Sequence, residues 1–165
     1  MKHIREKFGL NLSWVKEVNL FLHCLKDKNV SKKVLIIEDE KNLVKLLQVN
    51  LESRGFDVIT AFDGEEGLEK AFTELPDVIT LDIQLPKMDG WEVCKRIKSN
   101  PETKDMPVIF LTVIPQKEGG EKAKIAGADF YLTKPFDPSK LVDMIENIIK
   151  KKNEQKIPVQ KNTLI

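Results

Sequence analysis

Short apolar runs alternate with amphipathic stretches five times between residues 33 and 150. The runs are rich in Val, Ile and Leu, which is typical of buried strands, and apolar residues recur at helical spacing in the stretches that follow them. The predicted strands cover residues 34–37, 57–61, 77–81, 107–111 and 129–132, and the predicted helices cover residues 42–54, 64–75, 91–99, 117–126 and 138–150. Strict alternation predicts a parallel sheet with helices on both faces. Right-handed crossovers then favour a doubly wound, three-layer α/β sandwich.

Local signals place the ends and the inward faces of these helices. Gly55 is expected to end the first of them, and Pro76 the second. Asp63 is placed to cap the second helix, with Glu66 three residues later as in a capping box, and Asp137 to cap the last. The expected inward faces carry Leu43, Leu46, Leu47 and Leu51 in the first helix, Leu68, Ala71, Phe72 and Leu75 in the second, and Leu141, Val142, Ile145, Ile148 and Ile149 in the last.

Residues 1–31 stand apart from this pattern. Their apolar residues recur at roughly helical spacing between charged ones, which predicts one or two amphipathic helices. Two interpretations stay open: a helix for a partner or a second copy, or an extension that packs on its own domain or is loosely ordered. Residues 32–152 form the predicted domain, and residues 153–165 are a polar, basic tail.

Composition narrows the class of protein. The 165 residues are 41% hydrophobic and 32% charged, which is typical of one soluble globular domain. Twenty-seven basic against 26 acidic residues give a net charge of +1, which argues against nucleic acid or an anionic membrane as a partner. No apolar run reaches the length of a membrane span, and no signal peptide is evident. Cys24 and Cys94 lack the spacing of a zinc site or a disulfide framework, so we expect a reducing compartment, the cytoplasm.

Polar residues follow four of the predicted strands. Glu38 and Asp39 follow the first, Asp82 the third, Thr112 the fourth and Lys134 the fifth. Because the carboxyl ends of parallel strands share one edge, these five side chains are expected to meet in one crevice. Three carboxylates there would repel each other, and Mg²⁺ is the natural counter-ion for oxygen ligands. A lysine and a hydroxyl beside them suit a phosphoryl group, so the pattern predicts phosphoryl transfer to a carboxylate.

These residues lie in four stretches that resemble the receiver domains of response regulators, the CheY-like family of two-component signalling. The stretches are residues 34–40 (VLIIEDE), 81–90 (LDIQLPKMDG), 107–112 (PVIFLT) and 127–136 (GADFYLTKPF). The resemblance covers roughly residues 32–150, in which the stretches have the order and separations of the family. It implies a five-stranded parallel sheet of order 2-1-3-4-5, preceded here by an N-terminal helical extension.

The resemblance implies a metal site and a phosphoacceptor. Asp82 would accept the phosphoryl group, and Asp39 would bind Mg²⁺ directly. Glu38 would complete the acid pair that holds the metal or its waters, although an Asp is common at this position. Gln84 would give its main-chain carbonyl to the metal.

The resemblance also implies a switch. Lys134 would contact the phosphoryl group, and Thr112 would rotate to bond it. Tyr131 would then move inward as the aromatic switch residue. Val113 stands where a small residue is usual, which would narrow access to the phosphoryl group.

The implied function is that of a single-domain response regulator, with no enzyme activity beyond its own phosphorylation and dephosphorylation. It would receive the phosphoryl group from a histidine kinase or phosphotransfer protein. It would then bind a downstream protein through the surface of residues 117–126, 129–132 and the last helix. Neither direct binding of nucleic acid nor membrane insertion is expected, and a homodimer is left open.

Three alternative functions have different requirements. A flavin-binding electron carrier of similar fold would need a phosphate-binding loop where Glu38, Asp39 and Glu40 stand. An aspartyl-phosphate phosphatase would need a second acid two residues after Asp82, where this chain has Gln84. The third alternative, an unphosphorylated receiver-like interaction module, stays open.

Overall fold

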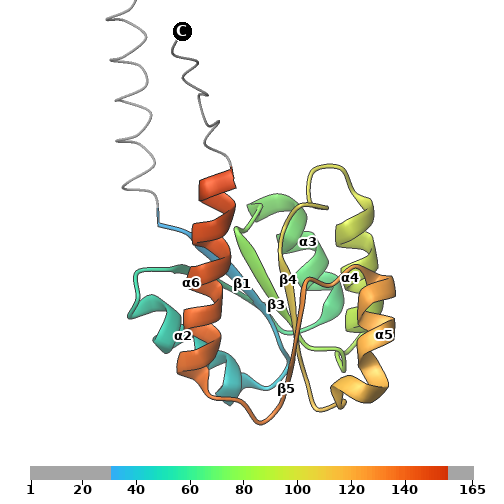
Figure 1. Ribbon diagram of the computed structural model, residues 1–165. Coiled ribbons are helices and arrows are strands. Elements are labelled where there is room, and N and C mark those ends of the chain that lie inside the picture. The colour runs from blue at the N-terminus through green and yellow to red at the C-terminus, as the bar shows by residue number, and fades with distance from the viewer. Residues whose placement is uncertain (1–30, 156–165) are drawn as a thin grey trace, which may run out of the picture. The chain divides into compact units, whose positions relative to one another are not determined.

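The computed structural model describes residues 31–155, and the predicted alternation of strands and helices is confirmed there (Figure 1). The elements are β1 (Lys33–Ile37), α2 (Lys41–Glu52), β2 (Asp57–Ala61), α3 (Gly64–Glu74), β3 (Val78–Leu81), α4 (Gly90–Ser99), β4 (Val108–Thr112), α5 (Gln116–Ala126), β5 (Phe130–Thr133) and α6 (Pro138–Gln155). The helices predicted before residue 31, and Cys24 with them, lie outside the described residues.

The five strands form one parallel sheet in the order β2-β1-β3-β4-β5, which confirms the expected order. The register aligns Ile37, the last residue of β1, with Leu81, the last residue of β3. Thr112 at the end of β4 is aligned in the same way with Thr133 at the end of β5. The residues that follow these strands therefore leave the sheet at one common edge.

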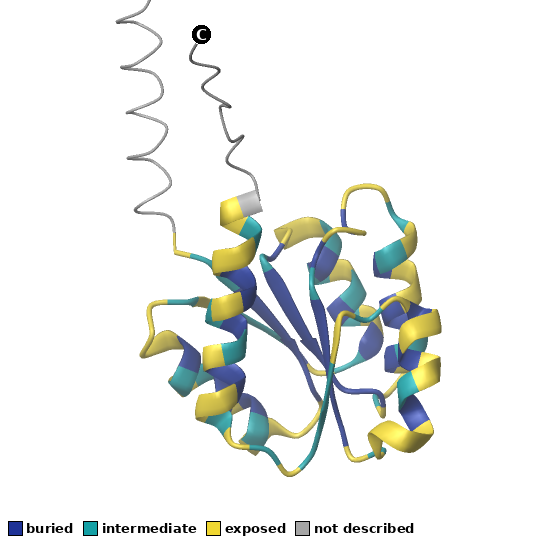
Figure 2. Cartoon of the chain, viewed as in Figure 1, coloured by how far each residue is buried: buried dark blue, intermediate teal, exposed yellow. Residues whose placement is uncertain are grey.

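Helices cover both faces of the sheet (Figure 1). Val34 and Ile36 of β1 join a buried cluster with α2 and α6, whereas Leu35 and Ile37 join a second cluster with α3, α4 and α5. Successive side chains of a strand point to opposite faces, so a sheet covered on both sides needs apolar residues throughout. Figure 2 shows the result: the central strands are buried, and the exposed residues lie mostly on the outer surfaces of the helices.

Two of the predicted helix faces need correction. Leu47 and Leu51 of α2 are buried as expected, but Leu46 is 47% exposed and Val44 takes its place at 3%. On a helical wheel at about 100° per residue, Val44 lies within about 60° of both Leu47 and Leu51, whereas Leu46 lies about 100° or more away from them. Leu75 is 52% exposed because it follows the end of α3 in a left-handed conformation, with φ 48°.

The predicted caps are confirmed. The Glu66 N–H donates to Asp63 Oδ1 at 2.8 Å, although the Glu66 side chain accepts from the Phe62 N–H rather than from that of Asp63. The Ser139 N–H donates to Asp137 Oδ1 at 2.9 Å at the start of α6, whose expected inward face is buried throughout. This helix continues to Gln155, beyond the predicted domain boundary at residue 152. Within residues 31–155, no helix is both long and apolar enough to span a bilayer.

Candidate functional site

Main-chain hydrogen bonds carry the sheet one residue beyond its strands. The Glu38 N–H donates to the Ala61 carbonyl at 3.0 Å, and the Asp82 N–H donates to the Ile37 carbonyl at 2.9 Å. Both acids are therefore held by the sheet itself, at the edge where β1 and β3 end. Both are buried, at 2% and 7% exposed, whereas Asp39 is exposed.

Lys134 joins the two buried acids from the other side of the site. Its Nζ lies 2.6 Å from Glu38 Oε2 and 2.9 Å from Asp82 Oδ2. Its own N–H donates to the Thr112 carbonyl at 2.8 Å, so the lysine is anchored at the end of β4. The structure thus brings together residues 96 positions apart in the chain, Glu38 and Lys134.

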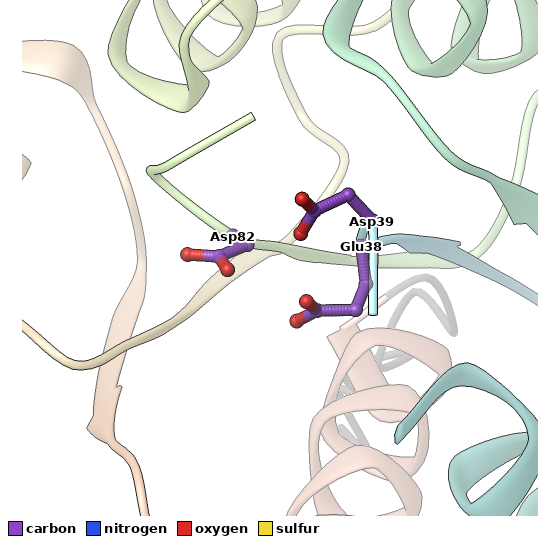
Figure 3. Close-up of side chains that lie close together, drawn as sticks. All are labelled: Glu38, Asp39 and Asp82. Atoms are coloured by element: carbon purple, nitrogen blue, oxygen red, sulfur yellow. The ribbon is translucent and has the colours of Figure 1, made fainter. Parts of the chain in front are cut away.

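Three carboxylates converge on this edge (Figure 3). One oxygen each from Glu38, Asp39 and Asp82 lie within 4.8 Å of one another. Lys134 supplies one positive charge against three negative ones, so the cluster keeps a formal excess of two negative charges. Hard divalent cations prefer oxygen ligands of this kind, and the donor set fits Mg²⁺.

Burial and charge set the protonation states of the buried pair. Burial raises the pKa of Glu38, the charge of Asp82 raises this pKa further, and the hydrogen bond from Lys134 opposes both. Burial alone would lower the pKa of Lys134, but the hydrogen bonds to Glu38 and Asp82 outweigh it and raise this pKa above its ordinary value. Lys134 therefore remains a cation at neutral pH, facing the Asp82 carboxylate.

The loop that follows Asp82 packs tightly on its surroundings. The Gln84 N–H donates to Asp82 Oδ1 at 3.2 Å, and a Cβ at position 90 would overlap the Asp82 carbonyl oxygen. A Cβ at position 64, in the first turn of α3, would overlap the Met88 carbonyl oxygen. Glycine is therefore required at both positions. The sequence stretch 81–90 includes Gly90 without indicating this close contact, and the one local signal for Gly64 is its place directly after a capping aspartate.

An ion pair fastens the same loop to α3. Lys87 Nζ lies 2.6 Å from Asp63 Oδ2, and Asp63 also caps α3. This contact was not predicted either, because it joins two loops 24 residues apart. Lys87 takes a positive φ of 64°, which is uncommon for a residue with a side chain.

The hydroxyls of Thr112 and Tyr131 both form hydrogen bonds with the main chain of one residue, Ile114. Thr112 is fully buried at the end of β4, and its Oγ1 accepts from the Ile114 N–H at 3.2 Å. The Tyr131 hydroxyl donates to the Ile114 carbonyl at 2.8 Å. The main chain of Ile114 therefore connects the two residues of the predicted switch. Val113, which follows Thr112 in the chain, is 56% exposed.

Comparisons with known proteins agree with this geometry. Residues 34–146 match the family model for the response regulator receiver domain. The alkaline phosphatase synthesis transcriptional regulatory protein PhoP of Bacillus subtilis is 44% identical over 122 residues, which cover 74% of this chain and 50% of that protein. The DNA-binding dual master transcriptional regulator RpaA of Synechocystis is 39% identical over 119 residues, which cover 72% and 49%. The chain spans about half the length of these curated relatives.

A solved structure extends the agreement to three dimensions. The CheY-like response regulator receiver domain protein of Methanospirillum hungatei superposes with a TM-score of 0.71 at 28% identity, covering 76% of this chain and 99% of that chain. The acidic triad of Glu38, Asp39 and Asp82 is typical of the receiver magnesium site. Receiver domains are signalling modules rather than enzymes, and their partners include histidine kinases. With the family match, the sheet order and the acidic site in agreement, the chain belongs to the response regulator receiver family of two-component signalling, with a CheY-like fold.

Proposed function

We propose that the chain accepts a phosphoryl group on Asp82 from a histidine kinase or a phosphotransfer protein, and signals by a change in its protein contacts. The observation that carries this proposal is the position of Lys134, whose ammonium group lies between the carboxylates of Glu38 and Asp82. A buried carboxylate next to a fixed cation, at the carboxyl ends of the strands of a parallel sheet, is suited to become an acyl phosphate.

The transfer can be written on the atoms of Asp82. A carboxylate oxygen of Asp82 attacks the phosphorus, the bond from phosphorus to the donor nitrogen of phosphohistidine breaks, and the nitrogen keeps the electron pair. Gln84 N–H already donates to Asp82 Oδ1, so the other oxygen, Oδ2, is the better placed acceptor. Lys134 would exchange its contact with Oδ2 for one with a phosphoryl oxygen. Because this ammonium group already lies next to Asp82, no further cation is needed on the Lys134 side of the site.

Four groups would hold a magnesium ion in the site. Asp39 and Asp82 would be direct ligands, Gln84 would contribute its main-chain carbonyl, and Glu38 would bind the metal or its waters. When bound, the ion offsets the negative charge of acceptor and phosphoryl group. Glu38 already accepts from Lys134, at Oε2, and from the Glu40 N–H at 3.3 Å, at Oε1, which favours a contact through water for this residue.

We further propose that Thr112 and Tyr131 move together. A Thr112 hydroxyl that turns toward a phosphoryl oxygen gives up the Ile114 N–H, and the Ile114 carbonyl holds the Tyr131 hydroxyl. Movement of this one residue would release the ring. The surface that changes would be formed by α5, β5 and α6, because Tyr131 lies in β5 and packs against Gly119 of α5.

The test is phosphorylation by acetyl phosphate followed by intact mass measurement. The full chain with Mg²⁺ should gain one phosphoryl group, and Asp82→Asn should gain none. Asp105→Asn, in an exposed loop, is the matched control and should label like the wild type. Equal uptake by Asp82→Asn would remove Asp82 as the acceptor, whereas no uptake by the wild type would favour the unphosphorylated interaction module.

The metal is tested in the same assay. Labelling should stop in excess chelator and resume when Mg²⁺ is restored. Trp91 follows Gly90 in the sequence, so its fluorescence offers a second readout of metal binding, with Trp14 as background. Undiminished labelling in chelator would remove Mg²⁺ from the mechanism and, with it, the role proposed for Asp39.

A further inference from the structure

The two edge strands of the sheet differ in whether side chains hydrogen-bond to their outward-facing main-chain groups. β2 lies at one edge and β5 at the other. On β2, the Lys70 ammonium donates to the Thr60 carbonyl at 2.6 Å, and the Glu66 carboxylate accepts from the Phe62 N–H at 2.9 Å. Two side chains of α3 thus occupy main-chain groups that a further strand would need. Such blocking is a common way to protect an edge strand.

In the described part of the chain, no comparable side chain covers the outer main-chain groups of β5. The Lys134 N–H, directly after β5, donates to the Thr112 carbonyl, and together with the register of β4 and β5 this bond fixes the phase of the strand. Alternate residues direct their main-chain groups to opposite sides, so those of Phe130 and Leu132 face β4, whereas those of Tyr131 and Thr133 face away from it. Within residues 31–155, no side chain hydrogen-bonds to these groups, and Phe130 is 40% exposed.

A groove lies on either side of this open edge. The larger, of about 970 Å³, runs between β5 and α6 and contains Phe130, Met144 and Ile148. The smaller, of about 290 Å³, runs between β5 and α5 and contains Tyr131 and Gly120. A strand added to β5 would send alternate side chains into the two grooves, which is how sheet edges recognise extended peptides.

The charged residues that line the larger groove indicate which kind of peptide it would bind. Two of its aspartates are already paired, Asp129 with Lys98 and Asp143 with Arg54. The ammonium groups of Lys104, Lys140 and Lys151 also line this groove, and they form no ion pair with any residue in the described part of the chain. Among the described residues that line the groove, only the carboxylate of Asp105 remains to offset these three positive charges.

We propose that the open edge of β5 binds an extended, acidic segment of a partner protein as an added strand, with its acidic side chains in the groove against α6. A helical partner makes its own main-chain hydrogen bonds and would leave the edge unused. A second copy of the chain would bring the same lysines to the groove. The proposal rests on the proposed function only in assigning this partner to signalling, because strand addition itself needs no phosphate on Asp82.

The test uses a peptide of about eight residues in which glutamate and valine alternate, which matches the length of a typical strand. It is titrated into the full ¹⁵N-labelled chain and followed by NMR. Saturable shifts are expected in β5 and on the α6 face of Met144 and Ile148, with β2 unchanged. Methylation of alternate peptide nitrogens removes donors but keeps every side chain, and should weaken binding about tenfold.

Matched variants test the charge argument. Lys140→Glu with Lys151→Glu should weaken the glutamate peptide about tenfold or more, because repulsion replaces attraction at two positions. Lys45→Glu, an exposed lysine of α2, should leave binding unchanged. A peptide with lysine in place of glutamate should not bind.

Three results would overturn the inference. The first is equal binding of the N-methylated peptide, and the second is shifts that map away from β5. The third is a dimer in sedimentation velocity that the peptide cannot dissociate, because a second copy would then occupy the edge.

A further experiment separates this inference from the proposed function. Peptide binding is measured on the wild type, with and without acetyl phosphate, and on Asp82→Asn. Loss of binding in every state, with Asp82 labelling intact, would sink the inference alone, whereas binding without labelling would sink the proposed function alone.

Discussion

At the scale of single residues, Thr80 is a polar side chain in an apolar setting. It lies in the middle of β3, is 1% exposed, and is aligned with Ile36 and Ile109 on the neighbouring strands. Its Oγ1 has no hydrogen-bond partner in the described part of the chain. A buried hydroxyl without a partner loses its hydration and gains nothing in return, so it lowers the stability of the fold.

We therefore expect Thr80→Val to raise the free energy of unfolding by about 1 kcal/mol, since valine has nearly the same shape without the unpaired hydroxyl. Denaturation in guanidinium chloride gives the value. Thr103→Val is the matched control: Thr103 is also buried, but its Oγ1 donates to the Ile97 carbonyl at 2.7 Å, so this variant should lose stability. Equal losses in both variants would mean that a bound water satisfies Thr80.

Tyr131 allows a pH measurement at one residue, because it is the chain's single tyrosine. Burial raises its pKa above the ordinary value of 10.0, and the charge of Glu118 raises it further. A folded pKa above the unfolded one means that the neutral phenol stabilises the fold. This contribution is complete below pH 10.0 and is lost as the pH rises from 10.0 through the raised value.

We expect the phenolate absorbance of the native chain to titrate above pH 10.0, and that of the urea-unfolded chain to titrate at the ordinary value. Glu118→Gln should lower the native midpoint only in part, because burial is the larger cause. A native midpoint at or below that of the unfolded chain would contradict the contact between the phenol and the Ile114 carbonyl.

At the scale of elements, the first turn of α3 supports the loop that carries Asp82. Gly64 donates its N–H to the Pro86 carbonyl at 3.2 Å and lies against the Met88 carbonyl, and Asp63 pairs with Lys87. The opposite end of this loop lies against Asp82 itself, through Gly90. The acceptor loop is thus held at both ends by backbone contacts that leave no room for a side chain.

Gly64→Ala should lower the free energy of unfolding by about 1–3 kcal/mol, because its methyl group meets backbone that cannot yield without shifting the loop. The rate of Asp82 labelling should fall as well. Gly120→Ala is the control: its methyl group would meet only Gln116 Cγ, at 3.4 Å, and alanine in a helix interior should add roughly 0.5–1 kcal/mol. Loss of stability in the Gly120 variant with none in the Gly64 variant would contradict these packing contacts.

The helices and strands also show which features of the fold and the site can be predicted from the sequence. The alternation of strands and helices and the strand-end positions of Glu38, Asp82 and Lys134 follow from hydrophobic periodicity, which survives small errors in element boundaries. The predicted inward face of α2 was partly wrong. Leucine and valine are both apolar, so the position of each on the helix, and not its residue type, decides which one is buried. The overlap at Gly64 and the Lys87 ion pair depend on the conformations of two loops that meet only after folding, and no local pattern encodes them.

At the scale of the whole molecule, the two core clusters draw their buried side chains from residues 34–149 of the described chain. The residues named in the candidate site lie between Glu38 and Lys134 in the sequence. A shortened chain that begins at Lys32 is therefore expected to fold and to accept phosphate on Asp82 at the rate of the full chain.

Circular dichroism on heating and intact mass measurement check this expectation, with the full chain as control. A cooperative transition and unchanged labelling are expected. A shortened chain that melts without cooperativity would show instead that the N-terminal segment covers apolar surface of the domain.

The unequal edges of the sheet limit how the protein can assemble. A sheet with two open edges can pair at both, and each added copy then presents a fresh edge to the next, which leads to fibres. In the part of the chain that the structure describes, Lys70 and Glu66 close the β2 side, and only β5 remains available. Growth by strand pairing therefore stops after one step, whether the newcomer is a peptide or another copy. The chain can keep one edge reactive for recognition at high cellular concentration without the hazard of polymerisation.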